Sequence, residues 1–530
     1  MEKYKVAVCD HIHKSGLEML QNESEINYLN IADLGKGEEF YNALHDVDVA
    51  ITRSSTDVDE KFLQSAKQLK AIVRAGVGVD NVDIDSCSKY GVIVMNVPTA
   101  NTIAAVELTM THILSNMRFF PYAHNHLKEE RIWKREKWYG HELKGKKLGI
   151  IGFGNIGSRV GIRAKAFEMD IVTYDPYIDS SKATDLGVKY TKDFNEILQC
   201  NIITIHTPKN SETIDMIGAE EIAKMKDGVV LINVARGGLY NEEALFDGLK
   251  SGKIRSAGID VFKKEPATDH PLLDLDNVTV TPHLGANTYE SQYNIGTQAA
   301  QQAIQAAKGS SYPNAFNLPI REEDVSESVK KYLNLIQKIG FISAQLNKSN
   351  LKSIKVYVEG DEVSKYIESL KTFAVVGAMR ESLGEKINYV NALPLAEERG
   401  VSIETATFST KSGFKNRVGV KLTTGDDIIQ VAGTIFGENE QRIVEVNGFE
   451  LDVKPEGNIT LFKNSDVPGV IGEVGSIFAK HKINISDFRL GRNENQALAV
   501  INSDQKATAE LISELSKLKT CHSVSTITIV

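Results

Sequence analysis

The chain has 530 residues, so its length predicts three or four domains instead of a single core. Its composition, 42% hydrophobic and 25% charged with a formal net charge of −9, is typical of a globular protein and argues against a general nucleic-acid binder. No apolar stretch reaches the roughly 18–20 residues that cross a bilayer, and no signal-peptide pattern stands at the start, so we expect a cytoplasmic protein. The four cysteines include no CxxC pair, so we expect neither disulfides nor a metal site.

In chain order, the first hundred residues alternate short apolar runs with polar helical patterns, which predicts a parallel sheet with helices on both faces. The expected strands are 5–9, 47–52, 70–73 and 92–97. We expect a long helix over 101–117 and then a polar segment over 124–142.

A second α/β unit begins with the apolar strand and glycine-rich turn of residues 148–157. Its further strands are expected at 171–174, 202–206, 228–233 and 278–281. Their spacing predicts a second doubly wound sheet. A helix over 292–308 follows, and the proline-containing segment 312–319 is typical of a domain boundary.

The pattern changes again in the last two hundred residues. Residues 321–454 mix helices and strands, and the last stretch has the order βαββαβ. The expected fold class is therefore α/β, with two doubly wound, Rossmann-like domains followed by an α+β domain and a βαββαβ domain. We expect the domain boundaries at 1–99 with 288–316, 100–287, 317–455 and 456–530.

A glycine fingerprint, GFGNIG, follows the strand LGII and precedes a helical pattern. Its glycines are Gly152, Gly154 and Gly157. The first permits a tight turn, the second lets the backbone approach a pyrophosphate, and the third lets the helix pack closely on the strand. The helix N-terminus offers free N–H groups and a partial positive charge to phosphates. The pattern predicts a dinucleotide site.

Asp175 ends the next strand, about 20 residues beyond the fingerprint, as this motif requires. A carboxylate there accepts hydrogen bonds from the adenosine ribose and repels a 2′-phosphate, which predicts NAD and not NADP. The alternative is a tight turn with Asp175 capping a helix, but the intact spacing of every part favours the cofactor.

Three further segments, NVARGG, DVFKKEP and TPHLGA, follow expected strands at the edge where doubly wound sheets bind ligands. They supply Arg236, Glu265 and His283. An imidazole can take the hydroxyl proton of a 2-hydroxy acid while a hydride leaves the same carbon for nicotinamide. A carboxylate partner fixes its tautomer, and a guanidinium binds the substrate carboxylate. Taken singly, such residues are typical of surface ion pairs; together with the fingerprint they favour catalysis. Asp260 is placed to hold the nicotinamide carboxamide.

These segments together resemble the D-isomer-specific 2-hydroxyacid dehydrogenase family, and within it the long-form D-3-phosphoglycerate dehydrogenases. The resemblance covers essentially the first 315 residues and includes RAGVGVDNVD (74–83) and HTP (206–208). It implies oxidation of 3-phospho-D-glycerate to 3-phosphonooxypyruvate with NAD, the first step of phosphorylated L-serine biosynthesis, in a homodimer or homotetramer. The domain of 1–99 with 288–316 would then bind substrate, and 100–287 would bind NAD.

The resemblance also implies the site residues. It assigns the acid–base role to His283, its partner to Glu265 and carboxylate binding to Arg236. The implied NAD contacts beyond the glycines are Asn155, Ile156, Asp175, Thr207, Ala235, Asp260 and Gly285. The implied substrate contacts are Arg53, Ser54, Arg74, Gly76 and Asn101. Arg53 and Arg74 suit a substrate with a phosphate as well as a carboxylate, although each alone is also typical of a surface loop.

Two segments before the second sheet bear on this likeness. The loop PTANT keeps Asn101 but departs from the PxGN of many members. Residues 131–149 resemble the family's dimer-crossing arm, with Trp133 and Trp138 as expected anchors.

The last two domains resemble regulatory modules. Residues 456–530 resemble an ACT domain, with Asp466 and Asn484 at its effector-binding positions, and they imply feedback by L-serine. Many relatives carry Asn in place of Asp466. Residues 317–455 resemble the intervening domain of the long-form enzymes and imply a second anion site. A purely structural oligomerisation role is the alternative for both.

Two rival functions remain open at this point. A glyoxylate or hydroxypyruvate reductase would share the cofactor and catalytic residues but usually lacks a regulatory tail of about 200 residues. A dinucleotide-sensing scaffold would share the fold, but the intact Arg236, Glu265 and His283 argue against it.

Overall fold

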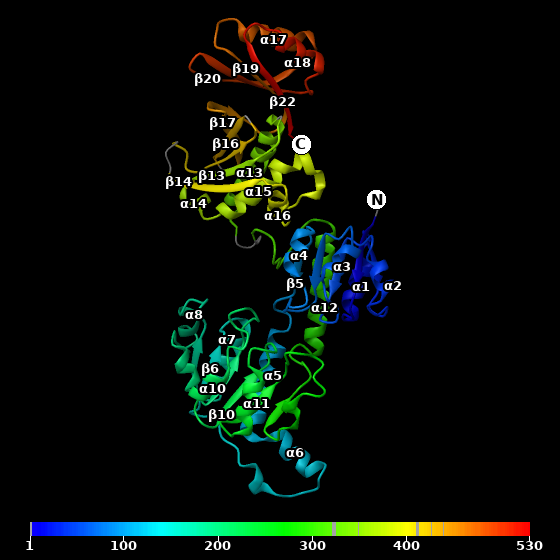
Figure 1. Ribbon diagram of the computed structural model, residues 1–530, viewed down its shortest axis with the longest axis vertical. Coiled ribbons are helices and arrows are strands. Elements are labelled where there is room, and N and C mark those ends of the chain that lie inside the picture. The colour runs from blue at the N-terminus through cyan, green and yellow to red at the C-terminus, as the bar shows by residue number, and fades with distance from the viewer. Residues whose placement is uncertain are drawn as a thin grey trace. The chain divides into compact units, whose positions relative to one another are not determined.

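The structure is a computed structural model that describes residues 3–320, 325–347, 349–409, 413–425, 427–437 and 439–529, without the side chain of Glu385. The chain divides into two compact units. The first is Met1–Val82 with Met95–Asn314, and the second is Asp83–Val94 with Ala315–Val530. Figure 1 labels the helices and strands.

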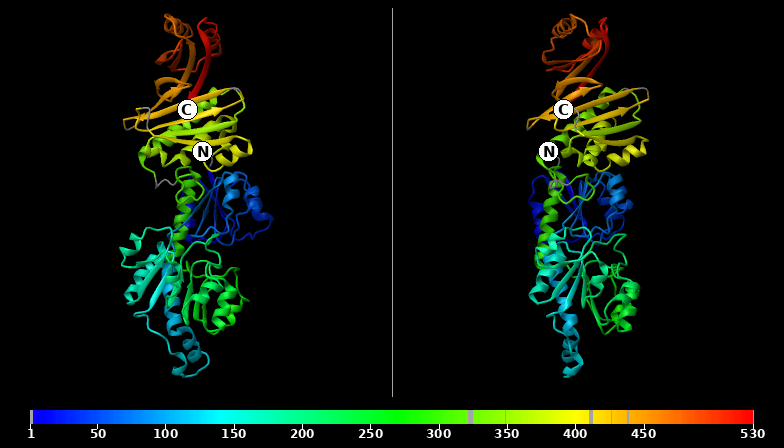
Figure 2. Two further views of the ribbon diagram at one scale, coloured as in Figure 1. Left: turned by 60° about the vertical axis from the view of Figure 1, so that its left-hand side comes forward. Right: turned by 90° about the vertical axis from the view of Figure 1, so that its left-hand side faces the viewer.

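The chain begins with a five-stranded sheet of order β2-β1-β3-β4-β5, in which the pairs among β1 to β4 are parallel. Its strands are β1 (Tyr4–Val8), β2 (Ile26–Asn30), β3 (Val49–Thr52), β4 (Ala71–Arg74) and β5 (Ile93–Asn96). Its helices are α1 (Lys14–Asn22), α2 (Glu38–Ala43), α3 (Glu60–Ser65) and α4 (Ile84–Lys89). The long helix α12 (Tyr289–Ala307) returns to pack on α1 and beside β3 and β4, as Figure 2 shows.

The second sheet has seven parallel strands in the order β12-β11-β10-β9-β6-β7-β8. Its strands are β6 (Lys147–Ile151), β7 (Asp170–Tyr174), β8 (Lys189–Tyr190), β9 (Ile202–Ile205), β10 (Val229–Asn233), β11 (Ile254–Ile259) and β12 (Val278–Val280). Its helices are α5 (Thr102–Arg118), α6 (Phe120–Lys128), α7 (Asn155–Ala166), α8 (Ser181–Thr184), α9 (Phe194–Leu198), α10 (Ala219–Lys224) and α11 (Glu242–Lys250), with the 3₁₀ turns η1 (Arg135–Trp138) and η2 (Pro271–Asp274).

Both faces of this sheet are covered. Successive strand residues point to opposite faces, so Ile150 enters the core beneath α5 and α7, whereas Ile151 enters the core with α10 and α11. The expected doubly wound α/β architecture is confirmed. Strands β2, β8 and β11 were not predicted, and the predicted strand and helix ends differ from the observed ones by at most three residues.

The second unit contains a six-stranded sheet of order β14-β13-β15-β16-β17-β18. Its strands are β13 (Ser353–Glu359), β14 (Ser402–Phe408), β15 (Arg417–Thr423), β16 (Ile428–Phe436), β17 (Glu440–Val446) and β18 (Phe449–Val453). Its helices are α13 (Glu327–Leu346), α14 (Asp361–Ser364), α15 (Ile367–Leu383), η4 (Gly384–Lys386) and α16 (Ala392–Glu398). Helices α13 and α15 cross closely at Gly377, where a Cβ would lie 2.0 Å from the carbonyl oxygen of Gln337. The glycine therefore permits the close approach.

The last module has the expected βαββαβ order, in an antiparallel sheet β20-β21-β19-β22. Its elements are β19 (Gly457–Ser465), α17 (Val470–Lys480), β20 (Ile485–Asn493), β21 (Gln496–Ser503), α18 (Ala509–Ser516) and β22 (Cys521–Ile529). One face packs under α17 and α18. On the other face Leu461, Val500 and Ile527 join the core of the six-stranded sheet, and Gln345 of α13 exchanges two hydrogen bonds with the backbone of Thr528, at 3.1 and 3.0 Å.

Within the described residues, none of the helices combines the length and the apolar character needed to cross a bilayer.

Candidate active site

The glycine fingerprint lies at the end of β6, the strand between β7 and β9 in the sheet. A Cβ on Gly152 would lie 2.8 Å from the carbonyl oxygen of His206, and one on Gly157 would lie 2.1 Å from that of Gly152. Among the described residues nothing lies within 4 Å of a Cβ built on Gly154, the N-cap of α7. Gly152 and Gly157 therefore close the turn, and Gly154 leaves the helix N-terminus open to a pyrophosphate.

Asp175 directly follows β7 and braces this turn. Its carboxylate accepts hydrogen bonds from the backbone N–H groups of Phe153, at 2.8 Å, and Tyr177, at 3.0 Å. His206 and Thr207 follow β9 and lie beside the turn at Gly152. His206 Nδ1 and Thr207 Oγ1 are buried and have no hydrogen-bond partner among the described atoms. Open backbone at Gly154, an acid at the ribose position and unsatisfied polar atoms beside the turn fit a dinucleotide.

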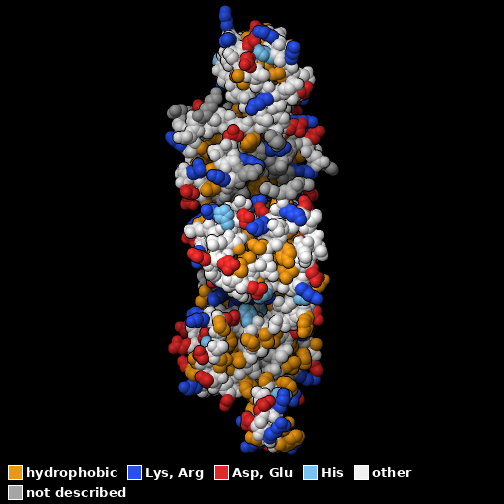
Figure 3. Space-filling view, turned by 90° about the vertical axis from the view of Figure 1, so that its right-hand side faces the viewer, with side chains coloured by type: hydrophobic (Ala, Val, Ile, Leu, Met, Phe, Trp, Pro, Cys, Tyr) orange, Lys and Arg blue, Asp and Glu red, His pale blue; other side chains and the backbone are white. Residues whose placement is uncertain are grey.

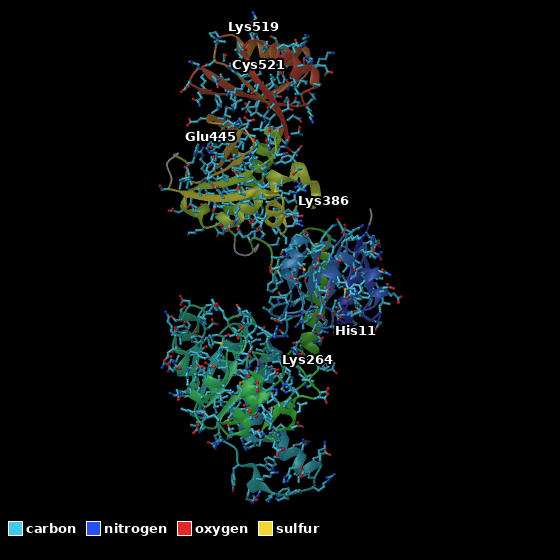
Figure 4. The ribbon with its side chains drawn as sticks, viewed as in Figure 1. His11, Lys264, Lys386, Glu445, Lys519 and Cys521 are labelled. Atoms are coloured by element: carbon cyan, nitrogen blue, oxygen red, sulfur yellow. The ribbon has the colours of Figure 1, made fainter. Side chains whose placement is uncertain are left out.

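The three predicted catalytic residues stand on loops after adjacent strands. Arg236 follows β10, Glu265 follows β11 and His283 follows β12. The first two loops are pressed together, because a Cβ on Gly237 would lie 1.9 Å from the carbonyl oxygen of Phe262. Figure 4 labels Lys264, which precedes Glu265 on its loop.

His283 Nδ1 lies 2.7 Å from Glu265 Oε2. The other oxygen of Glu265 accepts a hydrogen bond from Phe262 N, at 2.9 Å, so the carboxylate is held at both ends. Burial alone would raise the pKa of Glu265, but the hydrogen bonds from His283 and Phe262 and the charges of His283 and Arg236 outweigh burial, and its pKa lies below its usual value. An ionised Glu265 fixes the imidazole tautomer and leaves Nε2 as the atom that can exchange a proton with a substrate.

Arg236 is anchored by the outer α/β domain. Its Nε donates to Asp80 Oδ2 at 2.9 Å, and its Nη1 donates to the carbonyl oxygen of Ala235 at 2.7 Å. A Cβ on Gly78 would lie 2.0 Å from Nη2, so the glycine makes room for the guanidinium. The sequence interpretation missed the roles of Asp80 and Gly78, although both stand within the RAGVGVD segment on which the resemblance rests.

Two further arginines stand near Arg236. Burial, with the charges of Arg236 and Arg53, lowers the pKa of Arg74 to about 10. A Cβ on Gly76 would lie 1.7 Å from Arg74 Nη1, so this glycine makes room for a second guanidinium. Arg53 donates to the carbonyl oxygen of His11, labelled in Figure 4, at 3.0 Å. Arg74 is thus repelled by Arg53 and Arg236 and attracted by the carboxylates of Asp80 and Asp10. An anion bound beside the arginines would relieve the repulsion.

Asp260 shapes the loop that carries His283. We expected Asp260 to hold the nicotinamide carboxamide, and in the structure its side chain is buried, with 0% exposure. Its carboxylate accepts hydrogen bonds from the Thr281 hydroxyl at 2.6 Å and from the N–H groups of Leu284 at 2.7 Å and Gly285 at 2.9 Å. Asp260 therefore organises the loop of His283. Because Gly285 N donates to Asp260, this cofactor candidate also acts on the loop.

The remaining candidates lie just after strands or at the starts of helices. Ser54 is exposed after β3, Ile156 is half-buried in the first turn of α7, and Asn155 is exposed at its start. Asn101 is the N-cap of α5 without a capping hydrogen bond, and its Oδ1 is buried without a partner among the described atoms. Ala235 N donates to Asn233 Oδ1 at 3.0 Å, which shapes the turn before Arg236.

Comparison with known proteins decides the family. The profile of the D-isomer specific 2-hydroxyacid dehydrogenase NAD binding domain matches residues 110–285, that of the D-3-phosphoglycerate dehydrogenase intervening domain matches 328–447, and that of the ACT domain matches 459–520. D-3-phosphoglycerate dehydrogenase from Bacillus subtilis is 38% identical over 530 residues, which cover 99% of each chain. The chain belongs to the D-3-phosphoglycerate dehydrogenase family. The enzyme of that name from Archaeoglobus fulgidus is 36% identical over 96% of this chain and 95% of its own.

Solved structures match the dehydrogenase half. D-lactate dehydrogenase from Aquifex aeolicus, complexed with NAD and lactic acid, is 29% identical with a TM-score of 0.52, over 58% of this chain and 96% of its own. A glyoxylate reductase from Paecilomyes thermophila is also 29% identical, with a TM-score of 0.55, over 59% of this chain and 98% of its own. This member of the D-3-phosphoglycerate dehydrogenase family is an NAD-dependent oxidoreductase with a C-terminal ACT domain.

Of the two effector candidates in this dehydrogenase, Asp466 lines a cavity. The cavity, of about 310 Å³, lies where β19 and β20 meet the start of α17, and Gly469 and Arg492 also line it. Asp466 Oδ2 lies 3.3 Å from Arg492 Nε. Asn484 is not among the lining residues, and its Nδ2 donates to Asp504 Oδ2 at 2.8 Å. Within one chain the two candidates are therefore not brought together.

The two arm tryptophans differ in their surroundings. Trp138 is half-buried, stacks on Tyr122 at 6.2 Å between ring centroids and donates to His126 Nδ1 at 3.3 Å. Trp133 is 79% exposed. Trp138 thus packs within its own chain, and only Trp133 presents its ring outward.

Proposed function

We propose that this chain oxidises 3-phospho-D-glycerate to 3-phosphonooxypyruvate, with His283 as the acid–base residue. The observation that carries the proposal is the 2.7 Å contact of His283 Nδ1 with Glu265 beside three arginines. His283 Nε2 takes the proton of the 2-hydroxyl group, Glu265 stabilises the imidazolium, and Arg236 binds the carboxylate and the reacting oxygen. When bound, NAD accepts the hydride from the same carbon.

Arg53 and Arg74 would bind the phosphate, with Ser54, Gly76 and Asn101 completing the substrate site. Both arginines lie in the outer domain, after β3 and at the end of β4. Arg236 already pairs with Asp80. A second anionic group that reaches Arg53 and Arg74 would gain further attraction, so a substrate with two anionic groups is favoured. This separates the proposal from a glyoxylate or hydroxypyruvate reductase.

A steady-state assay tests the substrate. NADH should form with 3-phosphoglycerate and NAD, and NADH should be consumed with 3-phosphonooxypyruvate. D-glycerate, which lacks the phosphate, should give a kcat/KM at least about 100-fold lower, as expected when a charge-assisted contact is lost. Equal kcat/KM for both acids would refute the phosphate site, and no turnover with any 2-hydroxy acid would favour a scaffold.

The variant His283→Gln tests the acid–base role. It should lower kcat by about 100-fold or more and leave the Kd of NADH within about twofold, because the imidazole acts on the proton and not on the cofactor. The control Lys264→Gln, on the same loop system, should behave like wild type. An equal loss of turnover and NADH binding would contradict the assigned role.

We also propose that the ACT domain binds L-serine and that the intervening domain is regulatory. The Asp466–Arg492 pair offers opposite charges to the ammonium and carboxylate groups of an amino acid, in a cavity of about 310 Å³. Serine at millimolar concentration should lower kcat or raise the thermal midpoint of the wild type, with a weaker effect on Asp466→Ala. The serine proposal fails if neither quantity changes, and D-serine serves as the control ligand.

We propose a second copy of this chain as the partner of the arm. Figure 3 shows hydrophobic side chains on the projecting segment that carries α6 and η1. The exposed fractions are 66% for Phe120, 79% for Trp133 and 79% for Tyr139, which favours burial against a partner. Trp133→Ser should raise the dimer dissociation constant in sedimentation equilibrium, whereas Trp133→Phe should not. A monomeric wild type would refute this surface.

A further inference from the structure

A buried chain of polar side chains joins α5 to the loop that carries His283. His112 of α5 has 3% exposure. Its Nε2 lies 2.9 Å from Thr281 Oγ1, and its Nδ1 lies 3.1 Å from Thr279 Oγ1. The Thr281 hydroxyl lies 2.6 Å from Asp260 Oδ1. His112 thus contacts the loop of His283 at Thr281, and through Thr281 it is linked to Asp260.

The shortest contacts of this chain fit one arrangement of donors and acceptors. Thr281 has a single hydroxyl proton, which it donates to Asp260, so it accepts from His112 Nε2. The Thr279 hydroxyl lies 3.1 Å from His112 Nδ1 and 3.5 Å from the carbonyl oxygen of Ala257, so its proton goes to the closer acceptor, Nδ1. The Thr279 oxygen accepts from Asn116 Nδ2 at 2.7 Å. This arrangement requires a neutral imidazole. Burial lowers the pKa of His112, against the opposing charge of Asp260, which agrees with that protonation state.

At the other end, three successive backbone N–H groups converge on Asp260. His283 N donates to the carbonyl oxygen of Asp260 at 2.8 Å, and Leu284 N and Gly285 N donate to its carboxylate at 2.7 and 2.9 Å. His283 has a φ of +56°, in the left-handed region. A non-glycine residue keeps this conformation only where its surroundings hold it. The orientation of the His283 backbone therefore depends on Asp260.

We propose that His112 is a positioning residue for the dehydrogenase reaction. Together with Thr281 it fixes the carboxylate of Asp260, which holds the backbone that presents His283 to Glu265. The inference rests on the proposed function, since it presumes that His283 moves the substrate proton. The competing interpretation is a buried histidine that contributes to stability alone.

Substitutions of His112 distinguish the two interpretations. His112→Leu removes both hydrogen bonds at similar volume, and His112→Gln keeps an N–H donor for Thr281. Thr109→Val is the matched control, because Thr109 is buried on the same helix and its hydroxyl donates to Ala105 O within that helix. The kcat is expressed per NADH-binding site, so that unfolded protein does not count.

His112→Leu should lower kcat about 10-fold or more while the KM for NAD and the Kd of NADH stay within about twofold, since small displacements of a catalytic group cost up to about 100-fold. His112→Gln should recover most of the loss, and Thr109→Val should match wild type. A wild-type kcat for His112→Leu overturns the proposal. So does an equal loss in His112→Leu and His112→Gln that follows their thermal midpoints.

Thr281 gives an independent test, which also decides the matter if His112→Leu does not fold. Thr281→Ser keeps the hydroxyl and should retain turnover, whereas Thr281→Val should lose it as His112→Leu does. The double variant with His112→Leu should be little worse than either single one, because both break the same chain. Equal kcat for Thr281→Ser and Thr281→Val contradicts the inference.

His283→Gln in the same assay separates the two levels of the argument. If it keeps turnover, the proposed acid–base chemistry fails. If it loses turnover and His112→Leu does not, only the positioning role fails.

Discussion

The buried charge of Arg74 destabilises the folded chain. Burial and the neighbouring charges of Arg236 and Arg53 lower the pKa of Arg74 to about 10, so in the free protein its charge is disfavoured. Functional sites often retain such destabilising groups because a ligand relieves them. Replacing Arg74 with a neutral residue should therefore stabilise the free protein and weaken substrate binding.

We predict that Arg74→Met raises the thermal midpoint of the free protein and raises the KM for 3-phosphoglycerate by about 10–100-fold, the usual effect of a lost charge-assisted contact. Scanning calorimetry and steady-state kinetics measure the two quantities. Arg163→Met, on α7, should change neither by more than about twofold or 1 °C. A lower midpoint together with an unchanged KM would show that Arg74 is a structural residue.

His206 predicts a pH dependence of stability. Burial lowers the pKa of His206 to about 3, whereas histidine in an unfolded chain titrates near 6.5. Between these values the unfolded chain binds a proton that the native chain does not, so stability is fully present above about pH 6.5 and is lost as the pH falls. In His206→Gln the thermal midpoint should fall less between pH 7 and 5 than in wild type. The exposed His45→Gln should follow wild type, and identical slopes for all three proteins would contradict the assignment.

At the residue scale, the sequence was enough to select the candidate catalytic side chains but not to predict every contact that they make. Arg236, Glu265 and His283 could be found because parallel strands end at one edge. The role of Asp260 could not, since its partners are backbone N–H groups of residues 283–285, on the loop after the next strand. His112 reads as part of an apolar helix, and only the packing of α5 on β11 and β12 shows its hydrogen bonds.

At the scale of elements, two glycines in the turn from β6 to α7 have different roles. We expect Gly154 to matter for cofactor binding and Gly157 to matter for folding. A Cβ at position 154 meets open space, whereas one at position 157 would lie 2.1 Å from a backbone oxygen. Gly154→Ala should fold with a thermal midpoint near that of wild type but bind NADH at least about 10-fold more weakly, because the pyrophosphate approaches there. Gly157→Ala should lower the midpoint by several degrees. Fluorescence titration and thermal unfolding measure both; the same pattern in the two variants would oppose this division.

Two of the three strands that were not predicted have physical explanations. β2 is an edge strand in which only Ile26 is fully buried, so its hydrophobic signal is weak. β11 lies inside the sheet between β10 and β12, but it carries small residues because α5 lies close to it. A Cβ on Gly258 would lie 2.8 Å from His112 Nδ1. Close helix packing therefore removed the continuous apolar run that identifies a buried strand.

At the scale of the whole molecule, the proposed substrate is an anion and the chain is acidic. The formal net charge is −9, yet Arg53, Arg74 and Arg236 stand together at the proposed substrate site. Salt screens the attraction between these cations and the substrate, with a Debye length of about 10 Å at 0.1 M. The KM for 3-phosphoglycerate should rise several-fold between about 0.02 and 0.5 M NaCl, and the KM for D-glycerate should rise less. An equal salt dependence of both would argue against the phosphate site.

The shared core of the last two sheets limits how these two modules can respond to a ligand. Leu461, Val500 and Ile527 belong to the four-stranded sheet but fill the interior next to α13. The cavity beside α17 is bounded by β20 and by Ala499 of β21. A ligand there would contact a sheet whose opposite face is packed in the core of the six-stranded sheet. The two modules consequently share one hydrophobic core. Separating them would expose apolar surface on each fragment, so we expect neither fragment to behave as an independent domain.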